Sequence, residues 1–259
     1  MHFNYFDIHS HLNLSSLSEN TDEVIKKMEE KEIGTITVGT DFETSKKAVE
    51  LAEKHDFLWA TVGLHPNDNI SEIFDYEKYK ELAQNNKVVA IGETGLDYFR
   101  TVDAELQKRQ KEIFIKHIEL ALEINKPLMI HSRPSKGSMD AYEDVIEIVK
   151  NYPGVRANFH FFVGNIEIAK KALESGFTMS FDGPITFSRD YDDVIRFLPI
   201  ESIMAETDAP FAAPAPYRGK TCEPWMVEEV VKRIAEIKQL PLEEVSTAMV
   251  ENAKKFFNV

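Results

Sequence analysis

Short apolar runs alternate with longer amphipathic segments along this chain, and that alternation limits the folds open to it. Each run is short enough for a buried strand, and the segments between the runs carry the spacing of amphipathic helices. Repeated strand–helix units predict a parallel sheet, because the helix carries the chain back to the edge of the sheet where the next strand begins. The predicted strands are 5–11, 34–39, 57–63, 88–92, 127–130, 155–159, 177–181 and 203–205.

Helices are expected between these strands and after the last one. In the first helix, Thr21 or Asp22 is the expected N-cap, because short polar side chains can accept the unpaired N–H groups at a helix start. The predicted helices cover about 23–28, 42–55, 73–85, 103–125, 139–151, 165–175, 190–198, 223–238 and 241–257.

Eight strands that alternate with helices in 259 residues predict a single (β/α)8 TIM barrel, with the functional site at the C-terminal ends of the strands. A doubly wound open sheet is the main alternative, but it usually has fewer strands and a glycine-rich first turn, which this sequence lacks. No linker or change in composition divides the chain, so one domain is expected over residues 1–259.

The charge balance argues against a broad surface for polyanions. The formal net charge is −14, whereas proteins that bind nucleic acids over a wide surface usually carry a basic face. One cysteine, Cys222, allows no intramolecular disulfide and fits a reducing compartment. No signal segment or membrane-spanning run is evident, so a cytoplasmic protein without a membrane partner is expected.

Histidines and carboxylates recur at the ends of the predicted strands. His9 and His11 are two residues apart in the first strand, so their side chains point to the same side. Taken singly, each such histidine is more often a hydrogen-bonded core residue than a ligand. In a barrel, however, the strand ends converge on one face. Two metal ions that share a carboxylate would use four histidines and two carboxylates of the strand-end set. The members of this set are His9, His11, His65, Glu93, His131, His160 and Asp208.

Several blocks of the sequence resemble those of TatD-type metal-dependent deoxyribonucleases, and they occur in order over nearly the whole chain. They are Phe6-Asp7-Ile8-His9-Ser10-His11-Leu12, Gly63-Leu64-His65-Pro66, Gly92-Glu93-Thr94-Gly95-Leu96-Asp97-Tyr98, Ile130-His131-Ser132-Arg133, Glu206-Thr207-Asp208-Ala209-Pro210, Pro216-Tyr217-Arg218-Gly219-Lys220, Glu223-Pro224 and Glu251-Asn252-Ala253-Lys254.

The resemblance implies an amidohydrolase-type barrel and divalent-metal hydrolysis of phosphodiesters, by a hydroxide that two ions activate. It also implies a ligand set. One ion would be held by His9, His11, Glu93 and Asp208, and Glu93 would bridge to a second ion held by His131 and His160. The chain departs from the family at His160-Phe161-Phe162-Val163-Gly164, where the family usually has His-Cys-Phe-Ser-Gly. The bulkier Phe161 is expected to reshape the pocket and its substrate preference.

Roles follow for the residues around the ions. Asp208 is expected to serve as both ligand and proton acceptor, with Glu93 and His65 as the other catalytic residues. His65 would face the substrate or support the ligands from behind. Arg133 and Arg218 are the expected phosphate clamps, because a guanidinium group binds phosphate through two parallel hydrogen bonds.

Two further carboxylates, Asp97 and Glu206, are expected to orient the ligating histidines rather than bind metal. The cofactor is expected to be two divalent ions, drawn from Zn, Mn, Mg, Co or Fe. Ligation by imidazole suits the others better than Mg, although the resemblance implies activity with Mg in several members.

Three functions remain open at this point. The first is a 3′–5′ exonuclease acting on the end of a single DNA strand, without an obligate protein partner. The second is a metallohydrolase of small esters, lactones or amides on the same barrel, which the net charge and Phe161 favour. The third is a metal-binding barrel without catalysis, which a complete ligand set with a candidate base disfavours.

Overall fold

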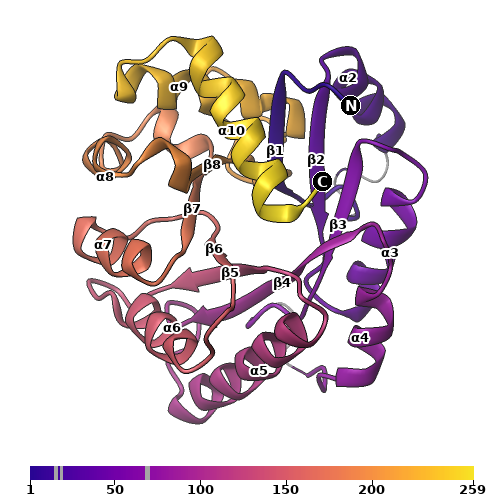
Figure 1. The fold of residues 1–259 in the computed structure, drawn as a ribbon, viewed down its shortest axis with the longest axis vertical. Helices are drawn as coiled ribbons and strands as arrows, with labels where there is room; N and C mark the ends of the chain where they lie inside the picture. The colour runs from indigo at the N-terminus through magenta and orange to yellow at the C-terminus, as the bar shows by residue number, and fades with distance from the viewer. Residues whose placement is uncertain (15–16, 18–19, 68–70) are drawn as a thin grey trace.

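The computed structural model describes every residue except 15–16, 18–19 and 68–70. Its core is a sheet in which consecutive strands are hydrogen-bonded neighbours, all parallel, in the order β1 to β8. Figure 1 shows these strands curving around a common centre with helices outside them, which is a TIM barrel as predicted. The strands are β1 (Tyr5–Ser10), β2 (Ile33–Val38), β3 (Leu58–Val62), β4 (Val88–Asp97), β5 (Leu128–Arg133), β6 (Ala157–Phe159), β7 (Thr178–Phe181) and β8 (Ile203–Ala205).

Closure of the barrel between its first and last strands depends on the residues just after β8. Ser10 forms a parallel bridge with Ala209, and the His11 N–H donates to the Ala209 carbonyl over 2.6 Å. The Asp208 N–H donates to the His9 carbonyl over 2.9 Å. This seam brings the strand-end histidines of β1 and Asp208 to the same place.

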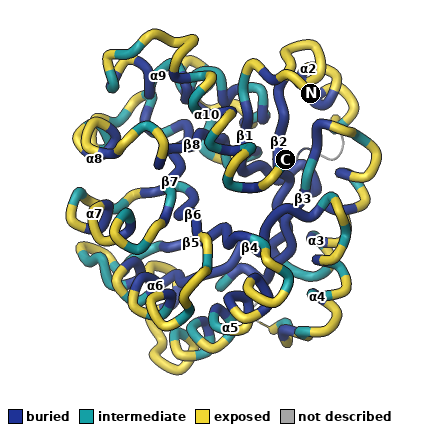
Figure 2. Tube along the Cα trace, in the orientation of Figure 1, coloured by how far each residue is buried: buried dark blue, intermediate teal, exposed yellow. Residues whose placement is uncertain are grey.

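The helices cover the outside of the barrel with one buried face each. Figure 2 shows the strands as buried and the outer sides of the helices as exposed. Several helices begin at a side-chain cap, as Asp41, Asp75, Asp103 and Asn165 each accept a backbone N–H in the first turn. The α-helices are α2 (Thr21–Glu30), α3 (Phe42–Ala52), α4 (Tyr76–Ala83), α5 (Ala104–Glu123), α6 (Asp140–Lys150), α7 (Ile166–Glu174), α8 (Asp192–Phe197), α9 (Val227–Lys238) and α10 (Leu242–Phe257), and the short 3-10 helices are η1 (Gly183–Thr186), η2 (Ile200–Ser202) and η3 (Pro224–Met226).

Several element ends are displaced by up to four residues from the sequence-based expectation, and two further differences concern the start of α2 and the course of β4. The cap of α2 is Asn20, not Thr21 or Asp22, and it caps without a side-chain hydrogen bond. Instead, the Thr21 hydroxyl donates to the Leu17 carbonyl. Strand β4 also continues to Asp97 instead of ending at Gly92, so that Glu93 lies within the strand. The pairing with β5 shifts register between Ile91 and Thr94, which resets the strand after Glu93.

Glycine at position 95 allows this continuation of β4. Its φ is +137°, and a Cβ there would lie 2.0 Å from the His131 carbonyl oxygen of β5. No L residue with a side chain fits in that space. Gly95 therefore keeps the ends of β4 and β5 in contact, with Glu93 and His131 above the same part of the barrel.

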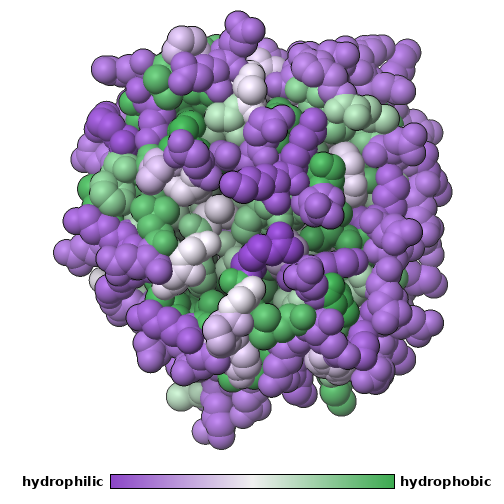
Figure 3. All heavy atoms as spheres, in the orientation of Figure 1, coloured by the Kyte–Doolittle hydropathy of each residue, from purple (hydrophilic) through white to green (hydrophobic). Residues whose placement is uncertain are grey.

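The outer surface is mainly polar. In Figure 3 hydrophilic residues cover most of the visible face, and hydrophobic atoms show as separate patches between them. Among the described residues, none of the helices is long and apolar enough to span a membrane.

Candidate metal centre

The strand ends bring two histidines of β1 together with two carboxylates. The Nε2 atoms of His9 and His11 lie 3.2 Å apart. His9 Nε2 is 3.4 Å from Glu93 Oε2 and 3.6 Å from Asp208 Oδ1. His11 Nε2 is 3.7 Å and 3.4 Å from the same two oxygens. These four side chains, here named the β1 group, converge on one point.

Glu93 faces a second set of imidazoles through its other oxygen. Oε1 lies 2.8 Å from His160 Nε2, 3.0 Å from His131 Nδ1 and 3.5 Å from His65 Nε2. Glu93 is therefore shared between the β1 group and this second set, here named the β5 group (Glu93, His65, His131 and His160).

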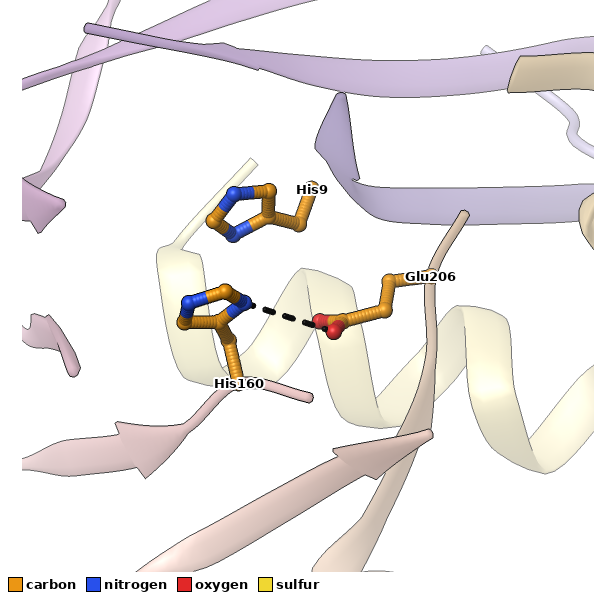
Figure 4. Close-up of side chains that lie close together, drawn as sticks. All are labelled: His9, His160 and Glu206. Atoms are coloured by element: carbon orange, nitrogen blue, oxygen red, sulfur yellow. Dashed lines mark ion pairs between the residues drawn. The ribbon is translucent and has the colours of Figure 1, made fainter. Parts of the chain in front are cut away.

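Two of the ring nitrogens that point away from the centre are hydrogen-bonded to fixed acceptors, whereas His160 Nδ1 has only an ion-pair contact. His11 Nδ1 lies 3.0 Å from the Val38 carbonyl oxygen. His131 Nε2 lies 3.2 Å from Asp97 Oδ2. His160 Nδ1 lies 3.5 Å from Glu206 Oε1, and Figure 4 shows this pair beneath the His9 ring, which stacks on the His160 ring at a centroid distance of 3.9 Å. An outer acceptor of this kind fixes the tautomer that leaves the inner nitrogen free to bind an ion.

A buried carboxylate braces the seam beneath the β1 group. Asp7 Oδ1 accepts the backbone N–H groups of His9 and Thr207, and Asp7 Oδ2 accepts the Thr207 hydroxyl over 2.7 Å. Asp208, which follows Thr207 in the chain, has a φ of +54°, a conformation that is uncommon for residues other than glycine. Such local strain is typical of functional sites, where the surrounding bonds hold it in place.

Three imidazoles of the cluster have raised pKa values, whereas burial and the neighbouring His160 lower the pKa of His9. Burial lowers the pKa of His160, but the carboxylates of Glu93 and Glu206 raise it well above its ordinary value. Burial likewise lowers the pKa of His11 and His131, and the neighbouring carboxylates more than reverse this. Burial raises the pKa of Glu93, yet the surrounding imidazoles hold it well below its usual range. The site would thus gain from a bound cation.

The donor set fits a divalent metal ion. Two ligand atoms about 2.0–2.2 Å from an ion at a tetrahedral angle lie roughly 3.3–3.6 Å apart. In the β1 group, the two histidine Nε2 atoms lie 3.2 to 3.7 Å from each other and from the Glu93 and Asp208 oxygens. In the part of the chain that the structure describes, the sets His9–His11–Glu93 and His65–Glu93–His131 each present ligand atoms within 4.8 Å of one another, and so does His9–His160–Glu206.

His65 differs from the other histidines in its hydrogen bonds. Its Nδ1 accepts the backbone N–H of Asn67 over 3.1 Å, so the neutral ring carries its proton on Nε2, which faces Glu93. The loop below is held by His117, whose Nε2 accepts the Leu64 N–H over 3.0 Å. With its proton on Nε2, the His65 ring donates a hydrogen bond from that atom rather than binding an ion through it.

A cavity of about 540 Å³ opens onto the centre. Arg133 lines it, as expected, and so does Arg100, which the sequence did not single out. Arg218 is not among the described residues that line it; its guanidinium group instead stacks on the Phe187 ring. The full lining is His11, His65, Glu93, Arg100, His131, Ser132, Arg133, His160, Phe161, Val163, Asp208 and Phe211.

Comparison with known proteins agrees with this geometry. A profile of the family described as TatD related DNase matches residues 6–258. The chain belongs to this family. It is 39% identical over 260 residues to YabD of Bacillus subtilis, described as an uncharacterized metal-dependent hydrolase, with 98% of this chain and 99% of YabD covered. It is 33% identical over 261 residues to YcfH of Escherichia coli, described in the same way, with 98% and 95% covered.

Solved structures of TatD proteins have the same barrel. The TatD homolog YjjV of Escherichia coli superposes with a TM-score of 0.89 at 25% identity, covering 99% of this chain and 98% of that one. A TatD family hydrolase of Entamoeba histolytica superposes with a TM-score of 0.84 at 22% identity, covering 99% of each, and shows the fold alone. This TatD-related chain is accordingly a metal-dependent hydrolase.

Sequence reasoning missed several residues of this TatD-related site. Arg100 follows β4 in a loop, and nothing in its own spacing marked it. His117 lies in a helix and had no strand-end signal, although it sits four residues after Ile113, whose carbonyl accepts from its Nδ1. Asp7 could have been found, because an acidic residue inside an otherwise apolar strand must have buried partners.

The departure at Phe161 does shape the cavity. Phe161 lines it and has a φ of +45°, and its backbone N–H donates to Glu206 over 2.6 Å. Phe162 instead points into the core, where it is 1% exposed. The same Glu206 carboxylate that approaches His160 therefore also holds the turn that presents Phe161 to the cavity.

Proposed function

We propose that this hydrolase is a deoxyribonuclease that removes nucleotides from the 3′ end of single-stranded DNA. The observation that carries the proposal is the shared cavity, in which Arg100, Arg133 and His65 face the same space as the β1 and β5 groups. A guanidinium group binds two oxygens of a phosphate through parallel hydrogen bonds. This cavity brings two guanidinium groups together on a chain whose net charge is −14. The family description as TatD related DNase also supports a phosphodiester substrate.

Two divalent ions fit the ligands in this proposal. His9, His11, Glu93 and Asp208 would hold one, and Glu93, His131 and His160 would hold the other. Imidazole-rich ligation suits Zn, Mn, Co or Fe better than Mg, which prefers oxygen ligands. When bound, such ions polarise the phosphodiester and lower the pKa of water.

The side chains of the chain itself then divide the remaining work. Asp208 accepts the proton of the attacking water, because its carboxylate lies at the cavity and is 15% exposed. His65 donates a hydrogen bond from Nε2 to the leaving oxygen, because the Asn67 hydrogen bond to Nδ1 keeps the ring proton on Nε2. Arg100 and Arg133 hold the non-bridging oxygens and align the phosphate for in-line attack.

The test uses a single-stranded DNA with a fluorophore on its 5′ end and protein reconstituted with Mn²⁺ or Zn²⁺. We expect a ladder that shortens from the 3′ end, stops with chelator, and is blocked by a phosphorothioate linkage at the 3′ terminus. Asp208→Asn, folded by circular dichroism, should lose this activity. Shortening that is unchanged in this variant would identify a contaminating nuclease and contradict the proposal.

A second candidate is a small-molecule metallohydrolase, which the apolar side chains of Phe161, Val163 and Phe211 in the cavity favour. Hydrolysis of a neutral ester or lactone that chelator abolishes, with no cleavage of the DNA strand by the same sample, would decide for this candidate. Cleavage of DNA with no turnover of neutral esters would decide against it.

A further inference from the structure

Two half-exposed phenylalanines carry stacked arginines at the mouth of the barrel. The guanidinium carbon of Arg133 lies 4.2 Å from the centroid of the Phe99 ring, which belongs to a residue that is 50% exposed. The guanidinium carbon of Arg218 lies 3.8 Å from the centroid of Phe187, which is 40% exposed. We name these the Phe99 pair and the Phe187 pair.

Both pairs lie at the C-terminal ends of the strands or on the loops that follow them. Phe99 follows β4 and Arg133 ends β5, two residues after His131 of the metal centre. Phe187 follows η1 beyond β7, and Arg218 lies in the loop after β8, ten residues after Asp208. The pairs therefore flank different parts of the centre, one beside the β5 group and the other on the loop of Asp208.

The loops that carry the Phe187 pair are tied to each other. The Ala215 N–H donates to the Thr186 hydroxyl over 2.8 Å. A Cβ on Gly183 would lie 1.8 Å from the Ala212 carbonyl oxygen, so only glycine permits the close approach of the two loops. Phe187 and Arg218 thus stand on a braced platform.

An exposed phenylalanine is common on protein surfaces and by itself needs no explanation. The arginines make these two different. A guanidinium group over a ring keeps its N–H groups at its edge, where they can reach a phosphate oxygen, while the rest of the ring remains open to a flat ligand. The combination of an open ring and an adjacent phosphate donor matches a nucleotide.

We propose that the Phe99 and Phe187 pairs are base-stacking sites for a single-stranded polynucleotide that crosses the metal centre. Each ring stacks on one nucleobase, and each arginine contacts a phosphate beside it. This inference rests on the proposed nuclease function and adds where the strand lies. Stacking accepts any base, because every base has a π face, whereas a duplex keeps those faces covered by its own stacking.

Phe211 adds a third exposed aromatic side chain, beside the metal centre. It lines the cavity, is 54% exposed, and its ring centroid lies 6.2 Å from that of His11. It offers the nucleotide at the scissile bond an apolar contact beside the β1 group. A strand held in this way needs no broad basic surface, which agrees with the acidic chain.

The experiment measures binding and turnover for Phe99→Ala, Phe187→Ala and Phe197→Ala. Phe197 is the matched control, because it is 39% exposed and has the Lys170 ammonium 5.7 Å from its ring centroid, but it ends α8 away from the strand ends. The probes are a labelled thymidine oligonucleotide, the same strand with abasic sites in place of the bases, and methyl p-nitrophenyl phosphate. Binding is followed by fluorescence anisotropy with metal-reconstituted protein.

We expect Phe99→Ala and Phe187→Ala each to raise the Kd and KM for the oligonucleotide by roughly 5- to 100-fold, the range that stacking of one base supplies. The abasic strand should bind the wild-type protein more weakly than the intact strand binds either single variant, because it lacks the bases for both sites, and the variants should not weaken it further. The loss on the oligonucleotide should exceed the loss on methyl p-nitrophenyl phosphate. Phe99→Trp should restore binding, and Phe197→Ala should leave it unchanged.

The outcomes separate the inference from the proposed function. Cleavage of the oligonucleotide with an unchanged KM in both alanine variants would overturn the stacking sites and leave the nuclease in place. Binding that the variants lose, without any cleavage by the wild-type protein, would keep the stacking sites and reject the nuclease. A wild-type protein that neither binds nor cleaves the strand would overturn both.

Discussion

His11 and His117 show that buried histidines can have opposite roles in two parts of the same barrel. Both are buried, at 3% and 0% exposure, and both place Nδ1 near a backbone carbonyl, Val38 for His11 and Ile113 for His117. Their Nε2 atoms differ. That of His11 lies 3.4 Å from Asp208 Oδ1, whereas that of His117 accepts the Leu64 N–H.

The pKa values of the two histidines move in opposite directions. Burial lowers the pKa of both, but the Asp208 carboxylate brings the net shift of His11 above the ordinary value. His117 has only the Ile113 carbonyl in its favour, so burial holds its pKa at about 4. Burial alone therefore does not decide the charge of a histidine. The mouth of the barrel is arranged to attract a cation, and the pocket under Leu64 is arranged to keep an imidazole neutral.

A substitution of Glu93 should have the largest effect on this contrast between His11 and His117, because Glu93 faces both the β1 group and the β5 group. Glu93→Gln keeps the shape but removes the charge that raises the imidazole pKa values and bridges the two groups. Loss of an outer partner of a metal ligand costs about 10- to 100-fold in metal affinity, so loss of this shared ligand should cost more than about 100-fold. Calorimetric titration with Zn²⁺ measures it directly.

Glu112→Gln makes the same chemical change on the exposed side of α5 and serves as the control. It should leave the affinity for Zn²⁺ within experimental error of the wild-type value. Zn²⁺ binding that survives in Glu93→Gln at wild-type strength would mean that the carboxylate is not a ligand.

The pH dependence of the free energy of unfolding tests the lowered pKa of His117. The pKa of His117 is about 4 in the folded protein and 6.5 in a model peptide, so the unfolded chain binds a proton first as the pH falls. The contribution of His117 is therefore complete above pH 6.5 and is lost progressively as the pH falls to about 4. A shift of this size corresponds to about 3 kcal/mol in the free energy of unfolding.

His117→Gln isolates this contribution, because a glutamine amide can donate to Ile113 and accept from Leu64 without titrating. Urea unfolding at pH 7 and at pH 4, with chelator present in both proteins, gives the difference between wild type and variant. That difference should shift by about 3 kcal/mol against the wild type at the lower pH. Equal pH dependence in the two proteins would show that His117 does not carry it.

The strand-end histidines could be predicted from the sequence to form a site, whereas the role of His117 could not. The order of apolar runs predicted the barrel, because strand–helix alternation leaves few topologies. The strand-end position of His9, His11, His131 and His160 predicted that they would meet, because a parallel barrel gathers strand ends on one face.

The contacts that depend on loop paths or helix packing could not be derived in this way. The ring contact of Arg218 with Phe187 joins two loops whose approach depends on Gly183, and sequence spacing does not specify such a path. The same limit applies to His117. Its place on a helix was clear, but which strand end that helix would support depends on how α5 packs against the barrel.

The smallest effect is expected at the carboxylates behind the β5 histidines, Asp97 and Glu206. They approach the outer ring nitrogens of these histidines, whereas the outer nitrogen of His117 faces a backbone carbonyl. Asp97 is the sharper case. Burial raises its pKa, but its bond to His131 and the other donors lower it to about 2, so it is a carboxylate at neutral pH. A charged acceptor behind a ligating imidazole makes the inner nitrogen a stronger donor to metal than a carbonyl does.

Asp97→Asn keeps an oxygen that can accept from His131 but removes the charge. His131 would then have a neutral acceptor at its outer nitrogen, as His117 does. We expect the affinity of the β5 group for Zn²⁺ to fall by about 10- to 100-fold, a smaller loss than in Glu93→Gln. Asp75→Asn, which retains a side-chain acceptor at the N-cap of α4, is the matched control and should bind Zn²⁺ normally. Equal affinities in the two variants would mean that the Asp97 charge does not act through His131, and that the carbonyl and carboxylate anchors are equivalent in this barrel.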